Sequence, residues 1–296
     1  THLTTAFITL NALCITTASS IASTEMLLPV TPTLSPDGQT LVFSWNHDLW
    51  SKSTDPKNTS DAKRLTFHPA RETNPKFSPD GVTLYYNSNR EGSTQIWSMR
   101  SDGVGPSTQV TLHSETNTIE DITDDGKQLI YRSVREAPGK SPYRLFSQDV
   151  AGLEPEKMLF DASAKSGKLS PDGKKLLITR EGVDPYRKGY HGTQSSQIWI
   201  YDKETQSFSQ PVQDKHGVKS PLWLKDGSGF YFVSGKGGNF NLWKHDLATS
   251  NNEQLTEYKE DSVMFPAISN DGSKIVFRKL FHYYLYDTNS GNVDKI

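Results

Sequence analysis

The chain has one cysteine among its 296 residues, and that cysteine, Cys14, lies near the start. A single cysteine excludes a disulfide within the chain and a zinc site built from several thiolates. The chain also lacks a surplus of positive charge, because 32 Lys and Arg residues face 34 Asp and Glu residues, for a formal net charge of -2. This balance gives no support for nucleic-acid binding, so we expect no nucleic-acid partner.

Sequence motifs of common active sites are missing too. The chain contains no Gly-x-Ser-x-Gly turn of a serine hydrolase, no complete P-loop and no His-Glu-x-x-His zinc motif. The segment from Asp121 to Gly126 resembles the beginning of a calcium-binding loop, but Thr123 and Arg132 replace the ligands usual at positions 3 and 12. We therefore expect no catalytic residue, no metal and no cofactor in this chain.

Long apolar runs are absent except near the N-terminus. Residues 3–22 carry no charge and are mostly apolar or hydroxylic, and a small-x-small sequence ends at Ala22. This pattern is typical of a secretory signal peptide, here with an incomplete start because the chain opens on Thr1 and lacks a basic segment. A membrane anchor is the alternative, which the many Thr and Ser residues disfavour. We expect residues 1–22 to be a signal peptide, the protein to be periplasmic or secreted, and no membrane contact after cleavage.

The chain does contain a turn motif that returns six times. In its second copy, Pro79 suits the first central position of a type I turn, Asp80 the second, and Gly81 the left-handed residue that follows. Apolar residues flank the turn, so two short strands are expected to meet there. The glycines of the six copies stand 43 to 54 residues apart, at Gly38, Gly81, Gly126, Gly173, Gly227 and Gly272. Such a period is typical of a propeller or another repeat array.

Each repeat has room for four strands, of which the third carries an aromatic residue. We expect these aromatics to pack in the core between neighbouring repeats. They are Trp50, Trp97, Phe146, Trp199, Trp243 and Tyr286. Six four-stranded repeats predict an all-β fold, a six-bladed β-propeller of four-stranded blades over residues 23–296. Pro211 falls in a fourth strand, where the edge of a sheet tolerates a missing backbone donor.

The segments between the second and third strands vary most in length, and the longest is Thr179–Gln197 in the fourth repeat. These loops share one face with the links between blades, and variable loops on one face mark the functional face. We expect the long loop to fold over the mouth of the channel. Our candidate substrate- or partner-binding residues on this face are Arg90, Arg135, Arg180, Tyr186, Arg187, Tyr190 and His191.

These candidates have the chemistry that a peptide requires, since Arg binds carboxylates through two parallel hydrogen bonds and Tyr supplies contact area. The alternative for the three arginines is Arg–Glu pairing between adjacent loops, which contributes little at a surface. His68 and His113 occupy equivalent links between repeats, so we expect them to form a repeated structural hydrogen bond rather than to act in catalysis.

The Ser-Pro-Asp-Gly turns, together with strands such as Gln95-Ile96-Trp97, resemble TolB-type propellers. More specifically, four segments are similar to the N-terminal propeller of tricorn-type serine peptidases, a resemblance that covers about residues 27–296. They are Pro32–Trp50, Arg64–Ala70, Ser88–Gly92 and Asp184–Gly192. Three copies of the turn depart from Ser-Pro-Asp-Gly but all keep the Asp-Gly pair, so the fold expectation stands.

The resemblance implies a propeller that performs no chemistry and filters or guides peptide substrates. In that family a PDZ-like module and a catalytic domain with the nucleophilic serine follow, so the implied partners are a peptide or protein substrate and these domains of the same parent chain. No catalytic residue of this chain is implied. Two alternatives remain open: a stand-alone TolB-like periplasmic protein-binding scaffold, and an enzyme whose site lies in the propeller channel.

Overall fold

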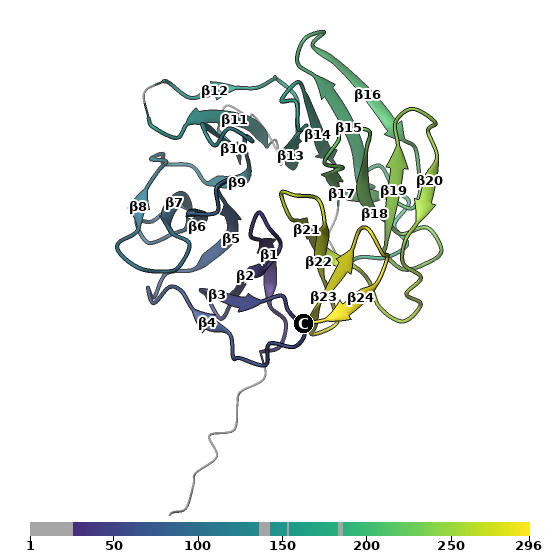
Figure 1. Cartoon of the computed structure of the whole chain (residues 1–296). Helices are drawn as coiled ribbons and strands as arrows, with labels where there is room; N and C mark the ends of the chain where they lie inside the picture. The colour runs from purple at the N-terminus through teal and green to yellow at the C-terminus, as the bar shows by residue number, and fades with distance from the viewer. Residues whose placement is uncertain (1–25, 136–142, 153, 183–185) are drawn as a thin grey trace, which may run out of the picture.

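The computed structural model describes residues 26–135, 143–152, 154–182 and 186–296. Within these ranges all regular secondary structure is β-strand. The strands form six antiparallel sheets of four strands each, arranged around a central axis as the blades of a propeller (Figure 1). The predicted all-β, six-bladed fold is therefore confirmed.

Each blade is a meander in which strands consecutive along the chain pair with each other. Blade 1 comprises β1 (Val30–Leu34), β2 (Thr40–Trp45), β3 (Asp48–Ser53) and β4 (Lys63–Arg64). Blade 2 comprises β5 (Glu72–Phe77), β6 (Thr83–Ser88), β7 (Gln95–Arg100) and β8 (Thr108–Gln109). Blade 3 comprises β9 (Asn117–Ile122), β10 (Gln128–Ser133), β11 (Arg144–Asp149) and β12 (Lys157–Met158). Blade 4 comprises β13 (Ser166–Leu169), β14 (Lys175–Arg180), β15 (Gln197–Asp202) and β16 (Ser207–Val212). Blade 5 comprises β17 (Val218–Trp223), β18 (Gly229–Ser234), β19 (Asn241–Asp246) and β20 (Asn252–Gln254). Blade 6 comprises β21 (Met264–Ile268), β22 (Lys274–Lys279), β23 (His282–Asp287) and β24 (Val293–Lys295).

The first strand of every blade lies nearest the axis and the fourth lies at the rim (Figure 1). First strands of successive blades contact one another, and β1 contacts β21, so the ring closes between the first and the sixth blade. Among the described residues each sheet contains strands of one blade only, so closure here uses no shared strand. Pro211 lies in β16, the outermost strand of blade 4, as predicted for a residue without a backbone donor.

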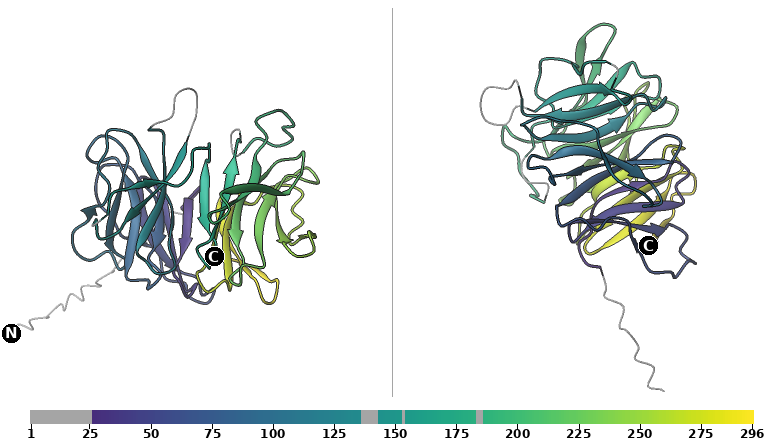
Figure 2. Two further views of the ribbon diagram at one scale, coloured as in Figure 1. Left: turned by 90° about the horizontal axis from the view of Figure 1, so that it is seen from above. Right: turned by 90° about the vertical axis from the view of Figure 1, so that its left-hand side faces the viewer.

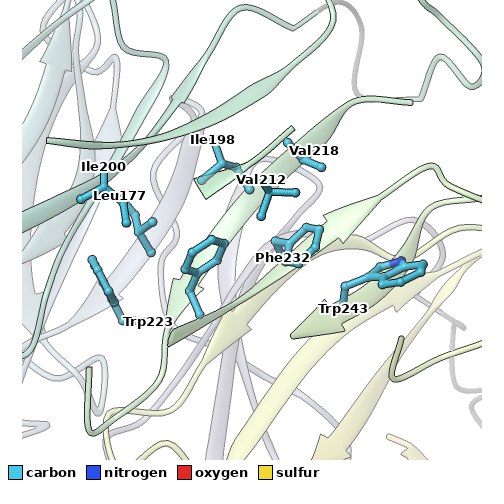
Figure 3. Packing of buried hydrophobic residues seen from close by; sticks show 9 residues of the cluster. Leu177, Ile198, Ile200, Val212, Val218, Trp223, Phe232 and Trp243 are labelled. Carbon is cyan, nitrogen blue, oxygen red and sulfur yellow. The ribbon is translucent and has the colours of Figure 1, made fainter. Parts of the chain in front are cut away.

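The hydrophobic core lies between neighbouring sheets, which stand face to face around the axis (Figure 2). Because both faces of a sheet are covered, its middle strands bury consecutive residues instead of every second one, and all six residues of β18 are buried. Between blades 4 and 5, Leu177 and Ile198 pack in one cluster with Phe232 and Trp243 (Figure 3). Burial of apolar surface between blades therefore supplies the main stabilisation of the ring.

The aromatic residues predicted for the core mostly lie there. Trp97, Phe146, Trp243 and Tyr286 are buried, and Trp50 and Trp199 are partly buried. The strand register corrects which aromatic residue of blade 6 corresponds to those of the other blades. In blade 2 Trp97 lies opposite Tyr86, and in blade 6 the corresponding pair is Tyr284 with Phe277. The prediction of Tyr286 as the equivalent residue is therefore wrong by two positions, and Tyr284 takes that place. The sequence pattern does not distinguish them, because β23 has an aromatic residue at both positions.

The recurring turn is held by its own side chains. Ser78 Oγ donates a hydrogen bond to Asp80 Oδ1 at 2.5 Å and accepts one from the Thr83 backbone N–H at 2.9 Å. Asp80 Oδ1 also accepts from the backbone N–H of Val82 at 3.0 Å. Gly81 has a φ of 75°, which a residue without a side chain adopts with little strain. The Ser/Thr-x-Asp-Gly pattern therefore sets the geometry of the turn locally, as the sequence predicts.

These turns make the stability of the propeller sensitive to acid. The hydrogen bond from Ser78 and that from the Val82 backbone lower the pKa of Asp80 below its usual 3.8. The pKa is lowered at the other five turns as well, at Asp37, Asp125, Asp172, Asp226 and Asp271. A lowered carboxyl pKa stabilises the fold above the pKa of the unfolded chain, and this contribution disappears as pH falls through the folded-state value.

We therefore expect the urea midpoint to decrease between about pH 5 and about pH 3, as the turn carboxylates take up protons. Asp80→Asn should lower the midpoint at the higher pH and should show a smaller decrease toward the lower pH than the wild type. Urea titrations followed by tryptophan fluorescence measure both quantities. An identical pH dependence in the variant and the wild type would show that this turn carboxylate is not linked to folding.

The predicted signal peptide, residues 1–22, lies outside the described residues, and this expectation stays a prediction. In the part of the chain that the structure describes, no helix is long and apolar enough to span a membrane.

Candidate functional site

A cavity of about 640 Å³ lies on the propeller axis, and we call it the mouth cavity. All six first strands contribute to its wall, and it opens on the face of the loops between second and third strands. A smaller cavity of about 180 Å³ lies at the opposite end of the channel, among the Asp-Gly turns. Both cavities are lined by Lys76, Lys168, Leu222 and Pro266, which we call the waist.

Irregular backbone on the first strands shapes the mouth cavity. Thr31, Asn74, Ser220 and Phe265 each precede a proline, adopt a positive φ of about 50° and lie where the pairing of the first strand with the second is interrupted by a bulge. All four line the mouth cavity. A bulge turns side chains out of the regular register, and such backbone costs of order 1–3 kcal/mol per residue. The channel wall therefore has the strained geometry that is common at functional sites.

Positive charge dominates the mouth cavity. Its wall carries six Lys and Arg residues, namely Lys76, Arg132, Lys165, Lys168, Arg187 and Lys219, against Glu120 and Glu181. Arg132 is neutralised by Glu120, which lies 2.8 Å away, whereas Arg187 forms no hydrogen bond with any of the described residues. A cavity lined mainly by one sign of charge concentrates ligands of the opposite sign. The mouth cavity is therefore suited to an anionic ligand.

The long loop of blade 4 contacts blades 5 and 6. The hydroxyl of Tyr186 accepts a hydrogen bond of 3.0 Å from Arg278 of blade 6, and its ring lies edge-on to Phe265, 6.2 Å between centroids. Lys188 Nζ donates to the side chain of Asn239 in blade 5 at 2.7 Å. Arg187 lies between these two anchored residues and lines the mouth cavity with its guanidinium 4.6 Å from the ring of Tyr190.

His191 fixes the end of the same loop. Its Nδ1 lies 2.8 Å from the backbone oxygen of Lys215, and its ring lies edge-on to that of His216, 5.3 Å between centroids. His216 lines the mouth cavity and pairs through Nδ1 with Asp214 at 2.7 Å. His191 therefore holds the loop against the link between blades 4 and 5.

Among the described residues, no group of three or more His, Cys, Asp or Glu side chains is placed to hold a metal ion.

Arg90 and Arg135 lie inside their blades and do not line the mouth cavity. Arg90 pairs with Glu72, whose side chain is fully buried, and lies over the ring of Trp97 at 4.4 Å. Arg135 donates to both carboxylate oxygens of Glu156, with one contact at 2.7 Å. The alternative of pairing with glutamate is thus closer to what is observed, but each partner is distant in sequence within the same blade. The Arg90–Glu72 pair is enclosed, whereas Glu156 is exposed.

Arg180 follows the same pattern, with its guanidinium 5.4 Å from the ring centroid of Trp199. Like Arg90 and Arg135, it does not line the mouth cavity. The structure thus separates the candidate residues into two groups. Tyr186, Arg187, Tyr190 and His191 come together at the mouth. The three arginines at or just after the ends of the second strands lie against third-strand aromatics.

The predicted structural role of the two repeated histidines is confirmed. His68 Nδ1 accepts a hydrogen bond from the backbone N–H of Ala70 at 3.1 Å, and His113 Nδ1 accepts one from Glu115 at 2.9 Å. Each histidine thereby closes a local turn within the link between two blades.

Sequence analysis missed the lysines of the channel wall. Lys76 and Lys168 lie on first strands, as does Lys219, and each precedes an Asp-Gly turn by four to eight residues. A signal was available, because first strands surround the axis in any propeller and a lysine there faces the channel or the next blade. The repeated motif marks the turns and loops of each blade, whereas the lysines of the first strands do not recur in a common pattern.

The profile of the family described as "Tricorn protease N-terminal beta propeller domain" matches residues 27–292. The chain belongs to this family. It is 24% identical over 270 residues to the tricorn protease homolog of Saccharolobus solfataricus, an alignment that covers 88% of this chain and 24% of that protein. It is 28% identical over 159 residues to the uncharacterized protein Atu1656 of Agrobacterium fabrum, covering 49% of this chain and 53% of the relative. The chain thus spans about half or less of the length of these curated relatives.

The crystal structure of the tricorn protease has the same propeller, with a TM-score of 0.77 at 20% identity over 92% of this chain and 26% of that one. TolB from Acinetobacter baumannii gives a TM-score of 0.64 at 18% identity, over 88% of this chain and 61% of that one. At such identities the likeness shows the fold alone. The structure and the family match therefore agree on a tricorn-type propeller that is also TolB-like.

Proposed function

We propose that this chain is a non-catalytic propeller that receives peptide or protein substrates at the mouth cavity, as the substrate-gating or substrate-guiding region of a tricorn-type serine peptidase. The observation that carries the proposal is the cationic mouth cavity, in which Arg187 is held at the opening without a hydrogen-bond partner among the described residues. A free guanidinium offers five donors in a planar fork that matches a carboxylate.

The remainder of the mouth wall suits the rest of a peptide. Tyr190, Phe240 and Phe265 supply aromatic surface, while Thr31, Asn74 and Ser220 of the first strands add polar residues to the wall. Specific ligand sites combine such apolar surface with a few oriented polar groups. A peptide would bind with its carboxylate near Arg187 and its side chains against these rings.

The proposal includes partners and a cellular location. A PDZ-like module and a peptidase domain of the same parent chain would be the partners, and the peptidase domain would perform the hydrolysis. The apolar run over residues 3–22 supports export to the periplasm or the medium.

Peptide binding to the purified chain tests this function. Fluorescence anisotropy with a labelled hexapeptide, as the free acid and as the C-terminal amide, should give tighter binding of the free acid. Arg187→Gln should weaken binding of the free acid by about tenfold or more, because a hydrogen bond to a charged group contributes about 1.5–3 kcal/mol. The amide, which lacks the carboxylate, should lose little affinity in the variant.

The matched control is Arg71→Gln, which removes an exposed guanidinium that does not line the mouth cavity. Equal affinity of acid and amide in the wild type, or equal loss in both variants, would contradict the proposal. The peptide should also remain intact during the assay. Hydrolysis that disappeared on one substitution in the channel, such as His216→Ala, would favour the alternative of an enzyme site within the propeller.

The second candidate function is that of a stand-alone, TolB-like protein-binding scaffold. Phe67 and Leu112 favour it, because they occupy equivalent links on the mouth face and are 73% and 87% exposed. Large apolar side chains exposed together on one face mark protein contacts. This candidate requires a folded partner and predicts no preference between the free acid and the amide of a short peptide.

A further inference from the structure

The waist and two acidic residues beside it, Glu120 and Asp121, bring together charged residues from three blades. Lys76 comes from β5 of blade 2, Glu120 and Asp121 from β9 of blade 3, and Lys168 from β13 of blade 4. Leu222 and Pro266 complete the waist with apolar surface from blades 5 and 6. The mouth cavity and the turn-side cavity meet at this point, so a ligand can reach it through the channel.

The two lysines differ in the hydrogen-bond acceptors available to their ammonium groups. Lys168 Nζ donates to the backbone oxygen of Glu120 and lies 3.3 Å from Asp121 Oδ1. Lys76 lies beside Lys168, and no hydrogen-bond acceptor or carboxylate partner is found for its three donors among the described residues. An ammonium that is largely removed from water and lacks an acceptor is costly, and the neighbouring charge of Lys168 increases that cost.

The charges at the waist do not balance. Lys76, Lys168 and Arg132 contribute three positive charges, and Glu120 and Asp121 contribute two negative charges. Burial also raises the pKa of Glu120, against the attraction of Arg132 and the two lysines. One positive charge is therefore in excess, and one negative charge would compensate it.

We propose that the waist is a binding site for one carboxylate group, held between the ammonium groups of Lys76 and Lys168. The two carboxylate oxygens accept hydrogen bonds from the free donors of the lysines, and the carbon chain lies toward Leu222 and Pro266. The ligand is a small organic acid or the carboxylate of a peptide that has entered the channel. The proposal does not depend on peptide binding at the mouth, because free formate suffices to test it.

Binding at the waist is coupled to a proton. Burial, followed by the charge of Lys168, lowers the pKa of Lys76 from 10.5 to about 7, while Glu120 and Asp121 oppose the shift. The empty waist thus loses its excess charge above about pH 7. A bound carboxylate stabilises the protonated amine and raises its pKa, so binding above this pH takes up a proton.

Calorimetric titration of the 296-residue chain with sodium formate, at constant ionic strength, tests the site. We expect one equivalent to bind near pH 6.5 and the affinity to fall roughly 50- to 100-fold by pH 9, in proportion to the protonated fraction of an amine with a pKa near 7. Titrations in two buffers of different ionisation enthalpy should show proton uptake near pH 8.

Three variants locate the effect. Lys76→Met should abolish formate binding, and Lys76→Arg should retain it with little difference between the two pH values, because guanidinium stays charged. Lys57→Met removes an exposed cation that lines neither cavity, and should leave both affinity and pH dependence unchanged. No formate binding to the wild type, or unchanged binding to Lys76→Met, would overturn the proposal, and the pH profile of Lys76→Arg tests it if Lys76→Met does not fold.

Competition identifies the source of the carboxylate. If formate weakens binding of the free-acid peptide but not of the amide, the peptide carboxylate occupies the waist. If formate binds with its pH dependence and does not affect the peptide, the ligand is a separate small acid and the mouth and waist are independent sites.

Discussion

Replacing Arg90 by methionine is expected to lower the free energy of unfolding by about 3–5 kcal/mol, because it leaves the buried Glu72 carboxylate without its cation. Arg90 also donates to the hydroxyl of Tyr86 at 2.9 Å and lies over Trp97, so its loss disturbs three groups within one blade. Burial already raises the pKa of Glu72. Without Arg90 the pKa should rise further, and the variant should regain part of its stability as pH falls and the carboxyl is protonated.

Urea denaturation of Arg90→Met, of Glu72→Leu and of the double variant measures this effect. The double variant should be more stable than Arg90→Met, since no buried charge remains unpaired. The control is Arg100→Met, which removes the cation of the exposed pair with Asp102 and should leave the midpoint nearly unchanged. A normal midpoint for Arg90→Met together with a loss of peptide binding would instead place Arg90 in the binding site.

Phe277→Ala is expected to destabilise the propeller by about 3–5 kcal/mol, because it removes a fully buried ring and leaves a cavity. Phe277 packs between blades 5 and 6, with its ring centroid 6.1 Å from those of both Tyr258 and Tyr284. The neighbouring sheets cannot close over the space without breaking their strand pairing, so little relaxation is expected.

Thermal and urea unfolding of Phe277→Ala measure the loss. Val82→Ala is the matched control, because Val82 is 56% exposed and lies at a turn, and its change should stay within about 0.5 kcal/mol. A loss of less than about 1 kcal/mol for Phe277→Ala would mean that the contact between blades 5 and 6 is looser than the structure shows.

The blade count and the strand order were predictable because their determinants are local. A turn such as Ser78–Gly81 forms from hydrogen bonds between residues two to five positions apart, and it recurs at a regular interval. The apolar pairs after each turn then mark the second strand. The third strand of blade 6 was misaligned because Tyr284 and Tyr286 satisfy the same pattern, and only pairing with Phe277 distinguishes them.

The hairpin register gave a partial signal for the role of Arg90. Regular pairing from the turn at Asp80 and Gly81 brings Glu72 to the end of β6, and the bulge between Thr73 and Lys76 then sets it opposite Ser88, two positions before Arg90. Arg135 gave no such signal, because its partner Glu156 precedes the fourth strand and comes into place only when β12 pairs with β11.

The waist could not have been predicted from the sequence. Lys76 and Lys168 are separated by more than ninety positions and belong to blades 2 and 4, so only ring closure brings them to a common cavity. Their proximity depends on the number of blades and on the bulge between Thr73 and Lys76 in β5, whereas β13 pairs without a bulge. The number of blades is not encoded near either lysine.

Site-specific cross-linking tests most directly the central claim that peptides bind in the mouth cavity. A free-acid hexapeptide with a photoreactive phenylalanine analogue would be irradiated with the wild-type chain and with Arg187→Gln, and the adducts mapped by mass spectrometry. We expect adducts at Tyr190, Phe240 or Phe265, with a lower yield in the variant. Adducts confined to the Asp-Gly turn face or the outer strands, at equal yield in both proteins, would contradict the account.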